Sequence, residues 1–98
     1  ESSTQVVDEI LAIKNIIKKT LPNSNVIVSN IIERLDDPEA SLCAKEVNDH
    51  LSKLKIDIID NSNIGKHELC KEGLHLNEWG SGKLAVNFIK RIKKFRKN

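Results

Sequence analysis

The chain has 98 residues, of which 39% are hydrophobic, 31% are charged and 3% are aromatic, and its formal net charge is +2. These values predict one globular domain with an aliphatic core. They exclude a membrane-spanning protein, because no apolar run approaches ~20 residues, and a disulfide scaffold, because Cys43 and Cys70 are the only cysteines.

An amphipathic helix is predicted at the start of the chain, over residues 4–20. Apolar residues recur every three or four positions from Val6 to Ile17, and Ser2 with Gln5 has the form of a capping box. Pro22 cannot continue a helix at low cost, so the helix is expected to end just before it.

The rest of the chain alternates between short runs of branched apolar residues and longer amphipathic stretches. The elements predicted in order are a strand at residues 26–32, a polar loop at 33–41, a helix at 42–54, a strand at 56–60, a long loop at 61–77 and a helix at 81–95. The residues of the last helix that are expected to face inward are Leu84, Ala85, Phe88, Ile89 and Ile92.

The element order α-β-α-β-α places the chain in the α/β class. A strand, a helix and a second strand in succession imply a right-handed parallel crossover with helices on both faces of the sheet. We therefore expect a partial, flavodoxin-like three-layer α/β/α unit with a short parallel sheet. Two strands alone make a marginal sheet, so residues 1–98 are expected to form a single, incomplete domain with an open sheet edge. The lack of an initiator methionine at Glu1 fits a piece of a longer protein.

The long loop after the second predicted strand carries the residues that best fit a functional site. Ligands of open α/β sheets bind beyond the carboxyl ends of the strands, which is where this loop begins. Its candidate residues are Asp60, His67, Cys70, Glu72 and His75. Two alternatives follow from these residues alone: a Cys70–His75 nucleophile pair, and a metal site formed by His67, Cys70 and His75. A loop thiol with no further support is expected to be inert. No second Cys or His pair has the spacing of a zinc site, so no metal site is predicted.

A serine nucleophile is not evident in this sequence. Ser62 lies in an Asn-Ser-Asn run, where a turn role is expected, and Ser81 is expected to cap the last helix. His50, one turn from Val47 and Leu54 on the predicted second helix, is expected to be a partly buried residue between the apolar and polar faces rather than a ligand. Trp79 is expected to cover the loop against the core, with an aromatic beside a substrate cleft as the alternative.

One stretch resembles a known family. Glu72-Gly73-Leu74-His75-Leu76-Asn77, followed by Gly80, resembles the last conserved block of the SGNH (GDSL-type) esterase and lipase family, in which an Asp-x-x-His pair precedes the terminal helix. Val26-Ile27-Val28-Ser29 looks like the family's fourth strand, and Ile58-Ile59-Asp60-Asn61-Ser62 looks like its fifth. The resemblance spans nearly the whole chain but only the C-terminal half of the family's domain.

The resemblance implies a site that is incomplete in this chain. His75 would be the general base of a serine ester hydrolase, and Glu72, in place of the family's usual aspartate, would orient it. Asn77 and Gly80 would shape the turn into the last helix. The blocks that carry the serine nucleophile and the oxyanion residues are not present, so the chain is expected to be inactive alone. The implied reaction needs no cofactor. The chain is expected to hydrolyse an ester only when the missing N-terminal half completes the site.

The alternative function is a non-catalytic binding or assembly module that pairs through its open sheet edge, either with its N-terminal half or with a second copy. Residues 90–98 hold six of the 16 basic residues and no acidic one, and they are expected to be a basic helix end or tail. Nucleic-acid binding is not expected, because no recognition motif or aromatic platform accompanies them. With no signal peptide and reduced thiols as the default, an intracellular location is favoured; in a secreted protein Cys43 and Cys70 could form one bridge.

Overall fold

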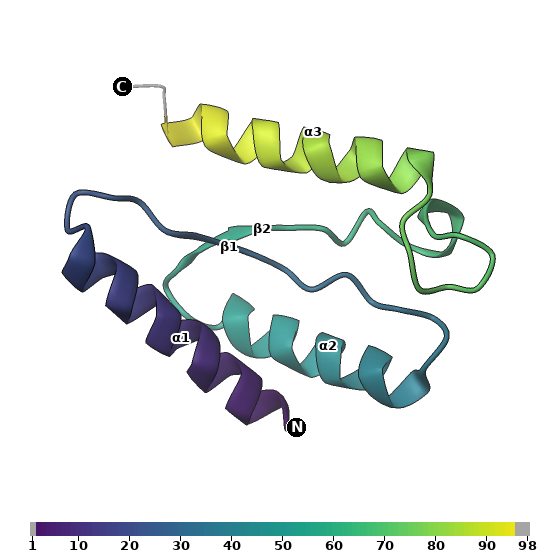
Figure 1. Cartoon of the computed structure of the whole chain (residues 1–98), viewed down its shortest axis with the longest axis horizontal. Coiled ribbons are helices and arrows are strands. Elements are labelled where there is room, and N and C mark those ends of the chain that lie inside the picture. Colours follow the sequence, from purple (N-terminus) through teal and green to yellow (C-terminus); the bar gives the residue numbers. More distant parts are fainter. Residues whose placement is uncertain (1, 96–98) are drawn as a thin grey trace.

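The computed structural model of the chain describes residues 2–95 (Figure 1). Its elements are α1 (Ser3–Thr20), β1 (Ile27–Ser29), α2 (Pro38–Ser52), β2 (Asp57–Ile59), the 3₁₀ turn η1 (Lys66–Glu68) and α3 (Glu78–Phe95). Helices α1 and α2 lie on one face of a short parallel sheet and α3 lies on the other (Figure 1). The predicted partial α/β/α unit is therefore confirmed.

Helix α1 begins where the sequence pattern places it. The Ser2 hydroxyl accepts a hydrogen bond from the Gln5 N–H at 3.2 Å, and the Gln5 side chain accepts one from the Ser2 N–H at 2.9 Å. This reciprocal capping satisfies two backbone donors that the helix leaves without partners.

Helix α2 begins at Pro38, four positions before the predicted start at Leu42. Asp37 caps it, because its carboxylate accepts hydrogen bonds from the N–H groups of Glu39 at 3.0 Å and Ala40 at 3.2 Å. Pro38 occupies the first helical turn, where its missing N–H costs nothing. The prediction of a loop at these residues was wrong, because an aspartate followed by proline was interpreted as a turn rather than as a helix start.

The two strands are parallel, with Ile27 opposite Asp57 and Ser29 opposite Ile59. Each has three residues and is shorter than predicted. Beyond Asn30, Asn48 of α2 binds the next residue of the chain: its side-chain amide accepts from the Ile31 N–H at 2.9 Å and donates to the Ile31 carbonyl at 2.8 Å. A side chain thus takes the backbone groups that a neighbouring strand would otherwise use.

The apolar core lies between the sheet and helices α1 and α2. Its buried centre is Val7, Val47 and Leu51, the last two with no exposed surface. Partly buried apolar residues from α1, α2 and both strands surround it. None of the helices within residues 2–95 has the length and apolar content needed to cross a bilayer.

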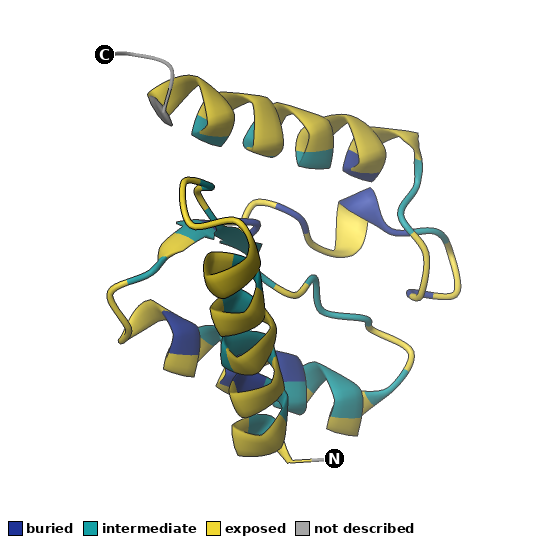
Figure 2. Ribbon diagram, turned by 60° about the vertical axis from the view of Figure 1, so that its left-hand side comes forward, coloured by how far each residue is buried: buried dark blue, intermediate teal, exposed yellow. Residues whose placement is uncertain are grey.

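Helix α3 covers the sheet with a different face from the one predicted. The residues that turn toward the protein are Gly80, Leu84, Asn87 and Arg91. The remaining residues of the predicted inward set, Ala85, Phe88, Ile89 and Ile92, are exposed, and Figure 2 shows α3 exposed along most of its length. The prediction was wrong because Asn87 and Arg91 have hydrogen-bond partners on the sheet side, and these polar contacts fix the rotation of the helix.

Candidate active site at the carboxyl ends of the strands

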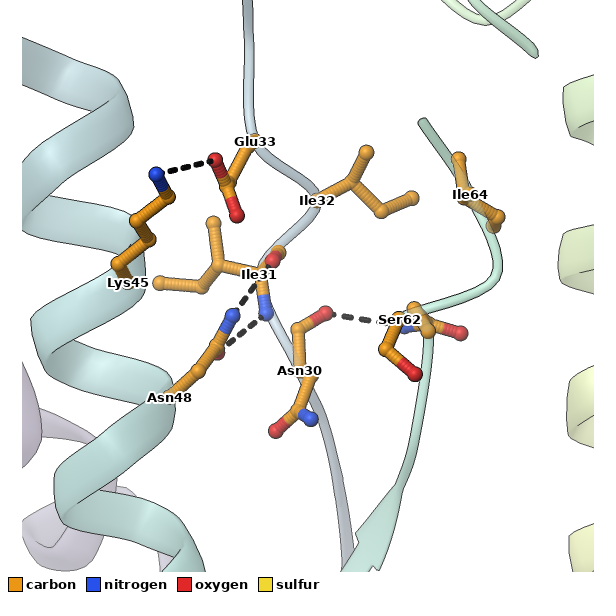
Figure 3. Close-up of a pocket in the computed structure, with 9 residues that line it drawn as sticks. Asn30, Ile31, Ile32, Glu33, Lys45, Asn48, Ser62 and Ile64 are labelled. Carbon is orange, nitrogen blue, oxygen red and sulfur yellow. Dashed lines mark hydrogen bonds and ion pairs between the residues drawn. The ribbon is translucent and has the colours of Figure 1, made fainter. Parts of the chain in front are cut away.

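A pocket of about 270 Å³ lies where the two strands end (Figure 3). The pocket is lined by residues 30–33 after β1, by Asn61, Ser62 and Ile64 after β2, and by Lys45 and Asn48 of α2. Lys45 forms an ion pair with Glu33 at 3.8 Å, which holds one charge of each sign at the pocket wall. The place agrees with the general location of ligand sites in open α/β sheets.

A network of asparagines fixes the inner side of this region. Asn61 is only 4% exposed, and its amide N–H groups donate to the Ser29 hydroxyl at 2.8 Å and the Asn30 carbonyl at 3.0 Å. Asn87 of α3 donates to the side-chain oxygens of Asn61 at 3.0 Å and Asn63 at 2.9 Å. The network joins both strand ends to α3. Buried amides remain stable only when their polar atoms are paired in this way.

The loop that carries the esterase-like motif folds back on itself. Leu69 and Leu76 form an isolated antiparallel bridge, and the Cys70 N–H donates to the His75 carbonyl at 2.7 Å. The Gly73 carbonyl accepts from the Leu35 N–H at 2.7 Å. The loop that follows β2 is therefore attached to the segment that follows β1, and His75 lies on the carboxyl-end side of the sheet.

Gly73 makes this attachment possible. Its φ of +77° favours glycine, and a Cβ at this position would lie 3.0 Å from the Cβ of Leu35 and 3.3 Å from the backbone nitrogen of Asp36. The Glu-Gly-Leu-His motif thus contains the residue that lets its own loop approach the neighbouring one.

The two predicted catalytic residues, His75 and Glu72, are both exposed at the surface of this loop. Within the described residues no hydrogen bond joins their side chains. Asp36 is a second carboxylate near the imidazole. The bidentate hydrogen bonds from Arg34, at 2.7 and 2.6 Å, lower the pKa of Asp36, and a positive charge on His75 lowers it further. Sequence reasoning missed Asp36, which lies far from the motif along the chain.

Asn77 and Gly80 form the junction between the loop and α3. Asn77 caps the helix, because its side-chain oxygen accepts from the Gly80 N–H at 2.9 Å, while its amide donates to the carbonyls of His67 and Leu69. Gly80 is buried against the Glu68 carbonyl. Ser81 was predicted to be the cap, which was wrong: its N–H donates to the Asn77 carbonyl inside the helix.

Glu68 of η1 is joined to α3 by an ion pair. Its side chain is 12% exposed, accepts from the Gly65 N–H at 2.8 Å and forms an ion pair with Lys83 at 3.2 Å. The Gly65 hydrogen bond and the Lys83 contact hold the pKa of Glu68 below its usual value, although burial opposes this. Its charged form is therefore favoured in the folded state.

Acid is expected to weaken the fold through Glu68. Because the folded-state pKa of Glu68 is lowered, its contribution to stability is complete above the unfolded pKa of about 4.5 and is lost as the pH falls below that value and through the folded pKa. Urea unfolding of the wild type and Glu68→Gln should therefore show a stability difference at pH 7 that shrinks over this pH range. Glu46→Gln, at an exposed position of α2, is the control. An unchanged difference at every pH would contradict the assignment.

The other candidates from the sequence lie apart. Ser62 has a turn role, as predicted, since its N–H donates to the Asp60 carboxylate at 2.8 Å. Cys43 and Cys70 form no disulfide within residues 2–95, and the Cys70 sulfur lies 3.6 Å from the Leu76 carbonyl. Among residues 2–95, no three His, Cys, Asp or Glu side chains, including His67, Cys70 and His75, gather where they could hold a metal ion.

Two expectations about single residues were wrong. His50 is exposed rather than partly buried, because it lies on the outer side of α2. Trp79 is 77% exposed and does not cover the loop, because α3 begins at Glu78 and turns it outward. It borders a surface pocket of about 340 Å³ between α3 and Asn63 of the loop after β2. Helix α3 includes Lys93 and Lys94 in its last turn, and residues 96–98 of the predicted basic end lie outside the described residues.

Comparison with solved structures relates this arrangement to an enzyme fold. The chain is similar to the esterase domain of the ZfL2-1 ORF1 protein from the zebrafish ZfL2-1 retrotransposon, with a TM-score of 0.83 and 19% sequence identity. The similarity covers 96% of this chain and 61% of that domain, so the chain spans less than two thirds of the solved domain. The chain has the fold of part of an esterase domain. No protein-family model matches it, and no curated protein matches it.

Proposed function

We propose that this chain is the C-terminal part of an SGNH (GDSL-type) ester hydrolase, in which His75 is the general base. The observation that carries the proposal is the coincidence of two independent features. The fold matches part of an esterase domain over 96% of the chain, and the Glu72 to Gly80 motif lies in the loop at the carboxyl ends of its strands.

In the proposed reaction, the imidazole of His75 takes the proton of a serine hydroxyl supplied by the N-terminal part of the domain. The serine oxygen attacks the ester carbonyl carbon, and the imidazolium then gives its proton to the departing alkoxide oxygen. Glu72, three residues before His75, orients the ring. The loop is suited to this role because it is hydrogen-bonded to segments after both strands while the His75 side chain stays exposed.

Reconstitution from two pieces tests the proposal. The polypeptide encoded directly upstream of Glu1 is produced separately and mixed with this chain, and hydrolysis of a short-chain p-nitrophenyl ester is followed. We expect hydrolysis only when both pieces are present, because the serine lies on one piece and the base on the other. Activity of the mixture no greater than that of the upstream piece alone would refute the proposal.

A second candidate function is a non-catalytic assembly module. The observation in its favour is the short sheet, in which β1 has β2 on one side and, among the described residues, no strand on the other. A mixture that assembles but hydrolyses no ester would favour this candidate.

A further inference from the structure

The two edges of the sheet differ, and only one of them is open to another strand. Arg91 of α3 covers the outer edge of β2: its Nε donates to the Ile58 carbonyl at 3.2 Å, and its guanidinium pairs with the Asp57 carboxylate at 2.7 Å. The Arg91 side chain is 21% exposed. A backbone carbonyl already bound by a charged side chain is not available to a new strand, so this edge is closed.

The outer edge of β1 keeps its pairing groups. The Asn30 N–H donates to the Ile59 carbonyl at 3.0 Å. In a parallel ladder alternate residues face the same neighbour, so Val28 and Asn30 pair with β2 while Ile27 and Ser29 direct their N–H and C=O groups away from it. Asn48 then binds both backbone groups of Ile31, which limits the open edge to β1 itself.

Helix α1 adds apolar surface beside this edge. A groove of about 230 Å³ runs between α1 and residues 26–28, and no residue of β2 lines it. Its helical wall is formed by Ile10, Ile13 and Ile17 together with Lys14. Ile13 is 58% exposed although it belongs to the apolar face of the helix.

Helix α3 adds apolar surface on the opposite face of the sheet. A groove beside β2 is lined on α3 by Lys90, Lys94 and the inward-facing Asn87 and Arg91, which places the lysine flank beyond β2. At about 100° per residue, Phe88 and Ile92 lie on the other flank of α3, toward β1, whereas Ile89 points away from the sheet. Phe88 is 36% exposed and Ile92 is 47% exposed. Apolar residues from both helical layers therefore extend past the open strand.

We propose that the β1 edge, together with Ile13 of α1 and Phe88 and Ile92 of α3, is the docking surface for an apolar strand running parallel to β1. A strand between two helical layers is buried on both faces, and such strands are typically parallel and apolar. The occupant is the N-terminal part of the esterase-like domain, since the solved domain contains chain with no counterpart here. The identity of this occupant rests on the proposed function. A strand that docks parallel to β1 ends at the same edge of the sheet as Ser29, so its carboxyl end lies beside the candidate site.

Matched charge substitutions test the surface. Ile13→Glu and Ile92→Glu place a carboxylate inside the proposed interface, whereas Ile16→Glu and Val86→Glu place one at exposed positions (63% and 47%) on other sides of the same helices. Binding of the upstream polypeptide is measured by isothermal titration calorimetry, and circular dichroism checks that each variant is folded. We expect the first pair to weaken binding by about tenfold or more and the second pair to change it less than about twofold.

A backbone substitution gives a second measurement. Ile27→Pro removes an N–H that points away from β2, so the ladder of the chain alone should survive while docking is lost. Val28→Pro is its counterpart, because it removes an N–H that faces β2 and should unfold the sheet. Equal binding by all exposed-residue variants, equal loss of binding in all of them, or a self-dimer that Ile13→Glu and Ile92→Glu disrupt would each overturn the proposal.

The outcomes separate this inference from the proposed function. Two pieces that bind through the β1 edge but hydrolyse no ester would refute the enzyme and leave the docking surface intact. Ester hydrolysis by a mixture whose binding does not change when Ile13, Ile92 or Ile27 is substituted would refute the docking surface and leave the enzyme intact.

Discussion

Replacing Gly80 with alanine is expected to destabilise the protein by about 3 kcal/mol, at the upper end of the cost of overpacking. A Cβ at this position would overlap the backbone carbonyl oxygen of Glu68 and lie 2.9 Å from the Leu76 side chain. The carbonyl cannot move alone, because it accepts the Asn77 N–H at 2.9 Å. The strain must therefore separate α3 from η1, which form this contact. A urea-unfolding midpoint well below that of the wild type checks the prediction.

Gly82 provides the control on the same helix. It is exposed, and a Cβ there would meet nothing within 4 Å. Gly82→Ala should stabilise the protein by about 1 kcal/mol, because alanine loses less backbone entropy in a helix than glycine. If Gly80→Ala lowers the free energy of unfolding and Gly82→Ala raises it, the loss at Gly80 is due to close packing and not to helix propensity. If Gly80→Ala were neutral or stabilising, the junction would have to be looser than the structure shows.

The elements of this fold were predictable where local signals agreed. The capping box at Ser2 and the helical repeat that follows it lie next to one another in sequence, and α1 formed as predicted. The start of α2 was available in the same way, because Asp37 followed by Pro38 is a capping residue followed by a first-turn proline. It was missed because the same pair also fits a turn.

The rotation of α3 was not predictable from hydrophobic periodicity. The apolar stripe implies burial of Ala85, Ile89 and Ile92, yet the helix turns Asn87 and Arg91 toward the sheet. A polar pair spaced four residues apart, in line with Gly80 and Leu84, was the available signal. Periodicity describes which face a helix would bury when every neighbouring layer is present. In this chain the apolar stripe fits a larger sheet than the one described.

The candidate site shows the same limit. The motif from Glu72 to Gly80 identified the loop from adjacent residues alone. Asn61 and Asp36 were missed because their contacts join segments far apart in sequence. Asn61 binds Ser29 and Asn30, which precede it by 32 and 31 positions. Asp36 follows Leu35, whose hydrogen bond to Gly73 joins this segment to the loop that carries His75. Long-range pairing of this kind leaves no local pattern.

Removal of the imidazole should abolish most catalysis in the reconstituted hydrolase. His75→Ala is expected to lower kcat/KM by about 10²–10⁴, the usual contribution of a general base, because the serine proton would have no acceptor. The fold should tolerate the change, since His75 is exposed and its loop is held through backbone groups. Steady-state hydrolysis of a p-nitrophenyl ester measures the loss, and an unchanged unfolding midpoint shows that the structure is intact.

His67→Ala is the matched control, because His67 is also exposed and lies in the same connection between β2 and α3. It should retain nearly full activity. The choice of orienting carboxylate is tested in the same assay with Glu72→Gln and Asp36→Asn. A larger loss with Glu72→Gln supports the family-like pair. A loss of activity confined to Asp36→Asn would indicate that Asp36, the carboxylate bound by Arg34, orients the imidazole instead. Unchanged activity in His75→Ala would show that the imidazole takes no part in the mechanism.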